Sequence, residues 1–447
     1  MSAGQVRPGR APFPSTRARQ ALAADDVFWP SAHALLAAAE TIRALLGDWP
    51  PLAAPWRFRL APPGPGVTAL GAPDAAPGTD AAQRTDAPPG KNAAPLPDPQ
   101  TVLIVATPPS ASLLAGWRLQ GAQVIDVSDD PTVLFAGGER YALRGARPDD
   151  WLAALAAFAD CGFALHDALC LALAWRGPEA AGELAATIAA STPAPTRPAA
   201  APATLPDAAA GPAVVAPPSP CWPDQLADFP TLSDLPACSW HFPRCPPVLG
   251  VYPIVPDAEW VERLIALGVR TIQLRVKHAD PGVLHEQVAR AVRAARRAPD
   301  EVRLFINDHW RQAIDAGAYG VHLGQEDMAT ADLAAIAAAG LRLGLSTHGY
   351  YEILHAWHFR PSYIACGPVF PTTTKIVKTA PQGVPRIAAY QRLLGAAVPV
   401  VAIGGIDLAS LPGVLATGVR SVAVVSAVTH ASELSATVGV LLAAFPA

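Results

Sequence analysis

The chain has few cysteines and no arrangement of them that would build a metal cluster. Six cysteines stand among 447 residues, and none forms a Cys-x-x-Cys pair. They are also too sparse for the dense disulfide framework of a small secreted domain. Structural metal clusters and disulfides are therefore disfavoured, and the cysteine usage fits the reducing cytoplasm.

Other absences narrow the class of protein further. The formal net charge is -4 and no basic stripe runs along the sequence, which argues against nucleic acid as a partner. The most apolar stretch, residues 152–175, is interrupted by Asp160, His166 and Asp167, so we expect core helix there and no membrane span. The basic N-terminus lacks the apolar region of a secretion signal. A transit peptide is one interpretation, and a disordered tail is the favoured one.

Proline, in contrast, is abundant, and its distribution divides the chain. Many of the 49 prolines fall within residues 61–99 and 191–220, together with Ala, Gly and Thr and without any helical or strand periodicity. Such composition is typical of flexible segments. The predicted organisation is a disordered tail at 1–24, a small α/β extension at 25–190 with a Pro/Ala-rich insert at 61–99, a linker at 191–244 and a barrel domain at 245–447.

The C-terminal region alternates between strand-like runs and amphipathic helical segments. The eight runs cover residues 250–255, 271–277, 303–308, 319–324, 342–347, 363–370, 399–405 and 421–428. This alternation predicts an α/β fold with a parallel sheet buried on both faces, and eight such units close into a (β/α)8 TIM barrel. An open doubly wound sheet is the alternative. It would carry a Gly-rich turn after its first strand, and the segment GVYPIVPDAEW has none.

The middle of the chain predicts a smaller α/β layer. Its expected elements are a helix within 26–46, strands at 101–107 and 122–128, a hairpin at 131–143 and helices at 149–159 and 166–175. The pair Gly137-Gly138 between two β-rich runs supports the hairpin.

Two carboxylates follow neighbouring strand-like runs of the predicted barrel. Asp308 comes just after residues 303–306, and Asp327 comes just after 319–323. Because parallel strands end at one edge, both carboxylates can reach a single Mg2+ ion, which prefers one or two carboxylates with water and substrate phosphate oxygens. A phosphorylated substrate is therefore predicted. Asp308 could also cap the helix that follows it.

Cations and a glycine pair stand at other strand ends of the same rim. Strand alternation predicts that Gln273, Arg275 and Lys277 share one face, although the two cations could also be solvated rim charges. Gly404-Gly405, backed by Ser426 after the eighth run, predicts a phosphate cradle of backbone N–H groups. His322 lies inside the fourth run, where a hydrogen-bonded core histidine and a catalytic histidine both fit.

Seven motifs together resemble one known family. QLRVK, FINDHW, GVHLGQED, LGLSTH, GPVFPTTTK, VAIGGI and VAVVSAV occur in this order and at barrel spacing. The region from about Pro247 onward closely resembles thiamine-phosphate synthase. That family joins a pyrimidine diphosphate to a thiazole phosphate with Mg2+, and it releases pyrophosphate to give thiamine phosphate. The resemblance implies a cytoplasmic transferase with these two small-molecule substrates, and it leaves the oligomeric state open, a homo-oligomer included.

The resemblance also implies a role for particular residues. Gln273, Arg275 and Lys277 would hold the pyrimidine diphosphate, and Asn307 and Ser346 would touch its pyrimidine or diphosphate. Asp308 and Asp327 would bind Mg2+, and Lys375 would contact the diphosphate. Thr372, Thr373, Thr374, Gly405, Val425 and Ser426 would bind the thiazole phosphate. The catalytic set would be Arg275, Lys277 and Lys375.

Two other functions stay open at this point. The barrel could be a non-catalytic sensor of thiamine precursors, or a related thiazole tautomerase that would lack part of the metal and diphosphate set. The extension faintly resembles the C-terminal portion of hydroxymethylpyrimidine phosphate kinases. Where those kinases need a Gly-rich turn with a catalytic Asp, this chain has RGARPDDW. A degenerate remnant that serves structure or partner contact is therefore expected.

Overall fold

The computed structural model divides the chain into two compact units. One consists of Met1–Ala181 with Ala227–Leu235, and the other of Gly182–Leu226 with Pro236–Ala447. The structure describes residues 33–46, 49, 57–61, 101–105, 111–119, 122–177, 221–277, 280–372 and 379–445. The predicted tail at 1–24, nearly all of the insert at 61–99, and the Pro-rich stretch 191–220 lie outside these residues.

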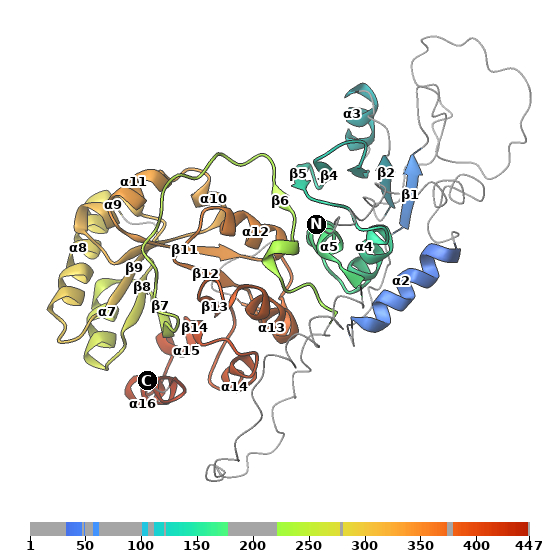
Figure 1. Ribbon diagram of the computed structural model, residues 1–447. Helices are drawn as coiled ribbons and strands as arrows, with labels where there is room; N and C mark the ends of the chain where they lie inside the picture. The colour runs from blue at the N-terminus through green and yellow to red at the C-terminus, as the bar shows by residue number, and fades with distance from the viewer. Residues whose placement is uncertain are drawn as a thin grey trace, which may run out of the picture. The chain divides into compact units, whose positions relative to one another are not determined.

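The second unit is a closed barrel of eight parallel strands (Figure 1). Around the barrel the order is β10-β11-β12-β13-β14-β7-β8-β9, so the strands follow one another in sequence and the last pairs with the first. The strands are β7 (Gly250–Val255), β8 (Thr271–Leu274), β9 (Arg303–Asn307), β10 (Gly320–Leu323), β11 (Arg342–Thr347), β12 (Tyr363–Cys366), β13 (Val400–Ile403) and β14 (Ser421–Val424). The predicted TIM barrel is confirmed, and the open doubly wound alternative is wrong.

Helices follow each strand and lie outside the barrel (Figure 1), and the last two come after the final strand. They are α7 (Ala258–Ala266), α8 (Pro281–Arg297), α9 (Trp310–Ala316), α10 (Gln325–Met328), α11 (Leu333–Ala338), α12 (Tyr350–His358), α13 (Gly383–Leu394), α14 (Leu411–Leu415), α15 (Ser426–Thr429) and α16 (Leu434–Ala443). Local sequence explains where several begin. Asp257 accepts a hydrogen bond from the Trp260 N–H and caps α7, and Asp280 precedes a proline at the start of α8.

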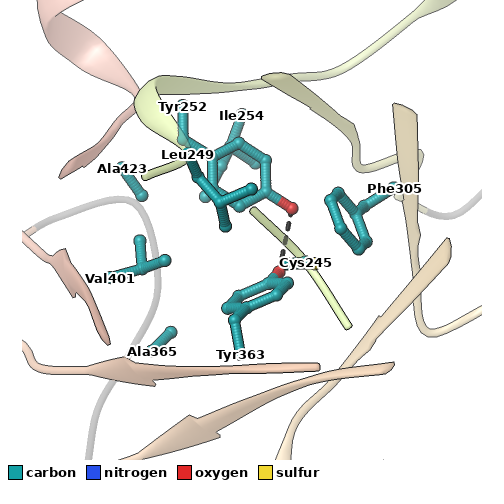
Figure 2. Close-up of a cluster of buried hydrophobic side chains, with 9 residues drawn as sticks. All are labelled: Cys245, Leu249, Tyr252, Ile254, Phe305, Tyr363, Ala365, Val401 and Ala423. Atoms are coloured by element: carbon teal, nitrogen blue, oxygen red, sulfur yellow. Dashed lines mark hydrogen bonds between the residues drawn. The ribbon is translucent and has the colours of Figure 1, made fainter. Parts of the chain in front are cut away.

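The barrel interior combines large aromatic side chains on one side with small residues on the other (Figure 2). The rings of Tyr252, Phe305 and Tyr363 lie with their centroids 5.1–5.8 Å apart and are tilted or edge to face. Ala365 and Ala423 belong to the same buried cluster. Pairing large with small side chains fills the closed interior as a packed core.

Several strands are shorter than the sequence predicted. β8 ends at Leu274, three residues before the expected end, and β12 ends at Cys366, four residues before it. The missing residues continue as loops at the mouth of the barrel. Apolar or β-prone residues there extend the strand pattern without joining the hydrogen-bonded ladder.

The first unit contains a six-stranded sheet in the order β1-β2-β3-β4-β5-β6. The first three strands pair in parallel, and the last four form antiparallel pairs. Its elements are α2 (His33–Leu45), β1 (Arg57–Ala61), β2 (Thr101–Val105), α3 (Ala111–Leu119), β3 (Gln123–Asp126), β4 (Thr132–Ala136), β5 (Glu139–Arg144), α4 (Trp151–Asp160), α5 (Leu165–Ala174), the 3-10 turn η1 (Leu226–Asp228) and β6 (Thr231–Leu232). The hairpin β4–β5 has the predicted turn at Gly137-Gly138, both with positive φ. The sequence did not reveal β1, α3 or β6.

The most apolar stretch of the chain forms the two helices α4 and α5, each ten residues long and buried along nearly its whole length. Among the described residues no helix is both long and apolar enough to cross a membrane.

Part of the segment expected as a linker is folded. Residues 221–226 and 236–249, which we call the strap, belong to the barrel unit. Trp222 is 2% exposed, and its indole N–H donates to the hydroxyl of Tyr350 on α12 at 2.8 Å. Asp224 accepts hydrogen bonds from Arg392 on α13. At the other end of the strap, the Ser362 hydroxyl donates to the Pro243 carbonyl at 2.7 Å.

We expect Trp222→Ala to destabilise the barrel by about 3–5 kcal/mol, because it removes a fully buried indole. Tyr350→Phe should cost less, about 1–3 kcal/mol, since it leaves the indole N–H without this acceptor. Hydrogen exchange of amides in the barrel strands measures both effects separately from the first unit. Trp357→Ala on α12 is the control, because Trp357 is only half-buried. Equal costs for the Trp222 and Trp357 variants would contradict the role of the strap.

Candidate active site

Two adjoining cavities open at the carboxyl ends of the barrel strands. The larger has a volume of about 700 Å3 and the smaller about 110 Å3. Both are lined by Ser346, Ile403 and Val425, so these three residues form the boundary between them. Two ligands held in the two cavities would therefore meet at this boundary.

The larger cavity brings together eight residues that the sequence predicted. They are Gln273, Arg275, Lys277, Asn307, Asp308, Asp327, Ser346 and the boundary residue Val425. Strand alternation was the reason to expect Gln273, Arg275 and Lys277 on one face, and it is wrong in part. β8 ends at Leu274, so alternation along the strand cannot place Arg275 or Lys277. Instead the backbone N–H of Arg275 donates to the Val255 carbonyl at 2.8 Å, which keeps the loop beside β7.

The carboxyl groups of Asp308 and Asp327 interact directly. Burial raises the pKa of Asp308 to about 6, with further increases from the charge of Asp327 and from a hydrogen bond between the two side chains. Arg275 acts in the opposite direction. Asn307 donates a side-chain hydrogen bond to the Asp308 carboxylate. Without a cation, Asp308 is therefore expected to take up a proton as the pH falls through about 6.

The backbone of Asp308 is unusual for a residue with a side chain. Its φ is 60°, in the left-handed region that costs a non-glycine residue free energy. Its N–H donates to the His322 carbonyl at 3.0 Å. The residue that precedes α9 is His309, which makes no side-chain cap, so the N-cap alternative for Asp308 is wrong. The conformation aims the carboxyl group into the cavity.

Asp327 lies on the short helix α10, which side-chain hydrogen bonds of Gln325 hold in place. Gln325 donates from its side-chain amide to the Ser346 carbonyl at 2.7 Å. The imidazole Nδ1 of His355 lies 2.8 Å from the other end of that amide, Gln325 Oε1. Burial lowers the pKa of His355, so it can serve as a neutral hydrogen-bonding partner.

The donor atoms of the larger cavity fit a hard divalent cation. In the part of the chain that the structure describes, no group of three or more His, Cys, Asp or Glu side chains could hold a metal ion. Mg2+ needs no such group, because it binds through one or two carboxylates and completes its shell with water and phosphate oxygens. The charge of Asp327 raises the pKa of Asp308, so the two carboxylates repel each other. A cation bound between them would relieve this repulsion.

The smaller cavity contains the other predicted residues that the structure describes. Thr372, Gly405, Val425 and Ser426 line it, together with Gly404. Both glycines have positive φ, 102° for Gly404 and 66° for Gly405. A Cβ at Gly404 would lie 2.5 Å from that of Pro368, and one at Gly405 would lie 2.5 Å from the Pro371 carbonyl oxygen. Only glycine therefore fits this turn, which leaves its backbone accessible. The predicted residues Thr373, Thr374 and Lys375 lie outside the described part of the chain.

Comparisons with known proteins point to one family. A family model described as thiamine monophosphate synthase matches residues 251–428. The thiamine-phosphate synthase of Neisseria meningitidis serogroup A is 57% identical over 190 residues, which are 42% of this chain and 91% of that protein. The chain belongs to the thiamine-phosphate synthase family. The synthase of Klebsiella pneumoniae is 54% identical over 203 residues, covering 45% of this chain and 94% of that protein.

A solved structure from Pyrococcus furiosus, a thiamine phosphate pyrophosphorylase, is 30% identical with a TM-score of 0.39 and covers 44% of this chain and 95% of its own. The residues that the family model matches all belong to the barrel unit, so the barrel is the part of the chain that the synthase family shares. The family model itself begins at residue 251, after the strap.

Sequence reasoning missed several residues that face these synthase-family cavities. Trp260, Thr429 and His430 line the larger cavity, and His348 lines the smaller. His322, for which the sequence left two interpretations, also lines the larger cavity and is hydrogen-bonded on both ring nitrogens. Its partners are Ser346 and Tyr363, and the Tyr363 hydroxyl in turn contacts that of Tyr252. Tyr252 and Tyr363 were missed as well. Their inward position within strands was the available signal, but it also fits ordinary core packing.

We expect Asp327→Asn to lower the pKa of Asp308 from about 6 toward its ordinary value, without restoring it fully. The substitution removes the charge of Asp327, whereas burial, the largest cause of the shift, remains. Carboxyl 13C chemical shifts measured against pH, with Asp308→Asn for assignment, test this. Asp332→Asn, at the exposed cap of α11, is the matched control and should change nothing. An unchanged Asp308 pKa in Asp327→Asn would show that the two carboxyls do not interact.

Proposed function

We propose that the mouth of the barrel joins a pyrimidine diphosphate, 4-amino-2-methyl-5-(diphosphooxymethyl)pyrimidine, to a thiazole phosphate and releases diphosphate. The protein is a thiamine-phosphate synthase, a transferase of thiamine biosynthesis. One observation carries the assignment of the two substrates. A cavity with a carboxylate pair and cations adjoins a cavity built on a Gly-Gly turn.

The larger cavity would take the pyrimidine diphosphate. Arg275 and Lys277 would bind the diphosphate from one side, and Lys375 from the segment after Thr372. Gln273, Asn307 and Ser346 would contact the pyrimidine or the inner phosphate. When bound at Asp308 and Asp327, Mg2+ would supply Lewis-acid stabilisation of the charge that develops on the diphosphate.

The smaller cavity would hold the thiazole phosphate. The backbone around Gly405 and Val425-Ser426, with Thr372, Thr373 and Thr374, would bind its phosphate, since oriented N–H groups and hydroxyls suit an anion. Anchoring the phosphate there would present the thiazole nitrogen at the boundary residues Ser346 and Val425. Proximity of this kind replaces a bimolecular encounter by a local step.

The chemistry that follows needs fixed positive charge more than it needs a base. The bond between the pyrimidine methylene carbon and the diphosphate oxygen breaks, and its electron pair leaves with the diphosphate. The aminopyrimidine ring delocalises the resulting positive charge. Arg275, Lys277 and Lys375 stabilise the departing anion, and the lone pair of the thiazole nitrogen forms the new carbon–nitrogen bond. That nitrogen carries no proton to be removed, so no general base is required.

A tautomerase or a precursor sensor fits the site less well. Neither would need two carboxylates and two cations around one cavity, because neither has to stabilise a leaving diphosphate. The first unit contributes to none of the synthase roles proposed here. In its RGARPDDW segment, Asp150 accepts a hydrogen bond from the Trp175 indole at 2.8 Å, which supports a structural part for this turn and no kinase chemistry. We place the protein in the cytoplasm because all six cysteines are free.

The decisive assay combines purified protein, both phosphorylated substrates and Mg2+, with detection of thiamine phosphate. Asp308→Asn and Arg275→Ala should each lower kcat by about 10²–10³-fold, by analogy with the loss of one preorganised electrostatic contact. Asp315→Asn, on the exposed face of α9, is the control and should retain full activity. Tight binding of a precursor without product would favour the sensor, and isomerised thiazole without condensation would favour the tautomerase.

We also expect Mg2+ to bind more weakly as the pH falls through about 6. Protonation of Asp308 competes with the ion, because its raised pKa makes the neutral form accessible there. Mg2+ titrations of the protein at pH 5, 6 and 8, followed by calorimetry, measure the effect. An affinity that does not change between these values would mean that Asp308 does not bind the ion.

A further inference from the structure

A chain of hydrogen bonds crosses the apolar interior of the barrel directly beneath the larger cavity. It runs through five side chains on five strands, in the order Gln273, Tyr252, Tyr363, His322 and Ser346. Consecutive polar atoms lie 3.3, 2.9, 2.7 and 2.8 Å apart. Figure 2 shows its central contact, the hydroxyl groups of Tyr252 and Tyr363 facing each other within the hydrophobic cluster.

The barrel is built to let this chain form. His322, Gly344 and Tyr363 are register partners on the neighbouring strands β10, β11 and β12. A Cβ at Gly344 would collide with the ring and hydroxyl of Tyr363. Because glycine stands there, the Tyr363 ring lies over β11 and stacks on the His322 imidazole with 5.6 Å between centroids. Tyr252 reaches the same hydroxyl from β7.

Only the two ends of this hydrogen-bonded chain have polar atoms that are not already used within it and could bond a ligand. Gln273, His322 and Ser346 line the larger cavity, whereas Tyr252 and Tyr363 do not, and both ring nitrogens of His322 are already hydrogen-bonded within the chain. Burial raises the pKa of both tyrosines, so each keeps its single proton. No described residue donates a hydrogen bond to the amide oxygen Oε1 of Gln273.

The donor and acceptor of each hydrogen bond follow from the Gln273 end of the chain. Gln273 Nε2 donates to the Tyr252 hydroxyl. Either hydroxyl could donate in the contact between Tyr252 and Tyr363, but among the described residues the Tyr252 proton has no other acceptor, which directs this bond from Tyr252 to Tyr363. Tyr363 then donates to His322 Nδ1. In a neutral imidazole one nitrogen accepts and the other donates, so the proton sits on Nε2 and is donated to Ser346 Oγ. The Ser346 proton is thereby left for the cavity. The chain presents an acceptor at Gln273 and a donor at Ser346.

This pattern complements a 4-aminopyrimidine, whose amino group donates and whose ring nitrogens accept. A 4-oxo pyrimidine offers the reverse, an acceptor at position 4 and a donor on the neighbouring ring nitrogen. Pairing with it would require the Gln273 amide to rotate and every proton of the chain to shift together. A site committed to one hydrogen-bonding pattern discriminates strongly against a ligand that leaves its buried groups unpaired.

We propose that Tyr252, Tyr363 and His322 are positioning residues that couple Gln273 to Ser346 and select the amino over the oxo form of the pyrimidine. The proposal rests on the proposed function, because it assumes that the larger cavity takes the pyrimidine. It assigns a task to three interior residues that the diphosphate chemistry does not use.

The first test is made on the wild-type protein, and one variant serves only to assign the signal. The 15N chemical shifts of the His322 ring, assigned by the resonance missing from His322→Gln, report which nitrogen carries the proton. We expect protonated Nε2 and unprotonated Nδ1 in the free protein. A proton on Nδ1, or shifts averaged between the two forms, would overturn the proposed direction of the chain. This measurement does not depend on turnover.

The second test measures selectivity. We compare kcat/KM for the 4-amino and 4-oxo pyrimidine diphosphates in the wild-type protein, Tyr363→Phe and Tyr390→Phe. The intrinsic difference in reactivity between the two rings cancels when the ratios are compared. Tyr363→Phe interrupts the chain and should lower the preference for the amino form by about tenfold or more. Tyr390→Phe removes another buried tyrosine hydroxyl, bonded to Gln382, and should leave the preference unchanged.

A preference within twofold of wild type in Tyr363→Phe would sink the proposal. If that variant is inactive with both compounds, their dissociation constants in the absence of thiazole phosphate give the same ratio by calorimetry. Failure of the proposed function is distinct and appears earlier, as absence of thiamine phosphate from the wild-type protein with the amino substrate.

Discussion

Closure of the barrel is the constraint on which the rest of the structure depends. Eight parallel strands pair in a ring, so the carboxyl end of every strand lies on one rim. Residues more than 150 positions apart, such as Gln273 and Ser426, thereby come to line two cavities that share a boundary. An open sheet with the same strands would bring only the middle strands into such proximity. The side chains at the mouth form one site because the sheet has no edge.

The mouth gathers groups that are individually unfavourable. Two carboxyls repel each other, Asp308 adopts a left-handed backbone, and the Gly404-Gly405 turn excludes every side chain. Each of these features costs free energy in the empty protein, and each would be relieved or used when a cation or an anion binds. The packed aromatic and aliphatic interior below supplies the stability that holds them in place.

The hydrogen-bonded chain through the interior is of a different kind. Polar groups in a barrel core are expensive unless they are fully paired, and here each interior hydroxyl and ring nitrogen has a partner. Such a chain contributes little net stability compared with an apolar core of the same shape. What it adds is direction, because each proton position depends on its neighbour. Recognition at the mouth is thereby connected to the packing of strands β7, β10 and β12.

The strap shows that the barrel unit is more than its eight strands and helices. Trp222, Asp224 and Pro243 contact α12, α13 and the loop before β12, and the two parts of the strap flank residues 227–235, which belong to the first unit. The chain therefore leaves the barrel unit after Leu226, contributes to the first unit and returns to the barrel unit at Pro236.

The sequence by itself determined the eight alternating units, the closed barrel and most residues of the site, because strand and helix periodicity and strand-end polarity are local properties. Those local properties placed Asp308, Asp327 and Gln273 at one mouth, and the family resemblance added Ser346. Only the tertiary structure decided the rest. Strand ends depend on which residues find a ladder partner, so β8 was predicted too long and Arg275 reached the cavity from a loop.

The strap looked like a linker because its contacts are with residues more than 100 positions away. The role of Tyr252 and Tyr363 was invisible for the same reason: an inward aromatic residue in a strand has one local pattern, whether it packs or carries a proton, and only its neighbours across the barrel distinguish the two.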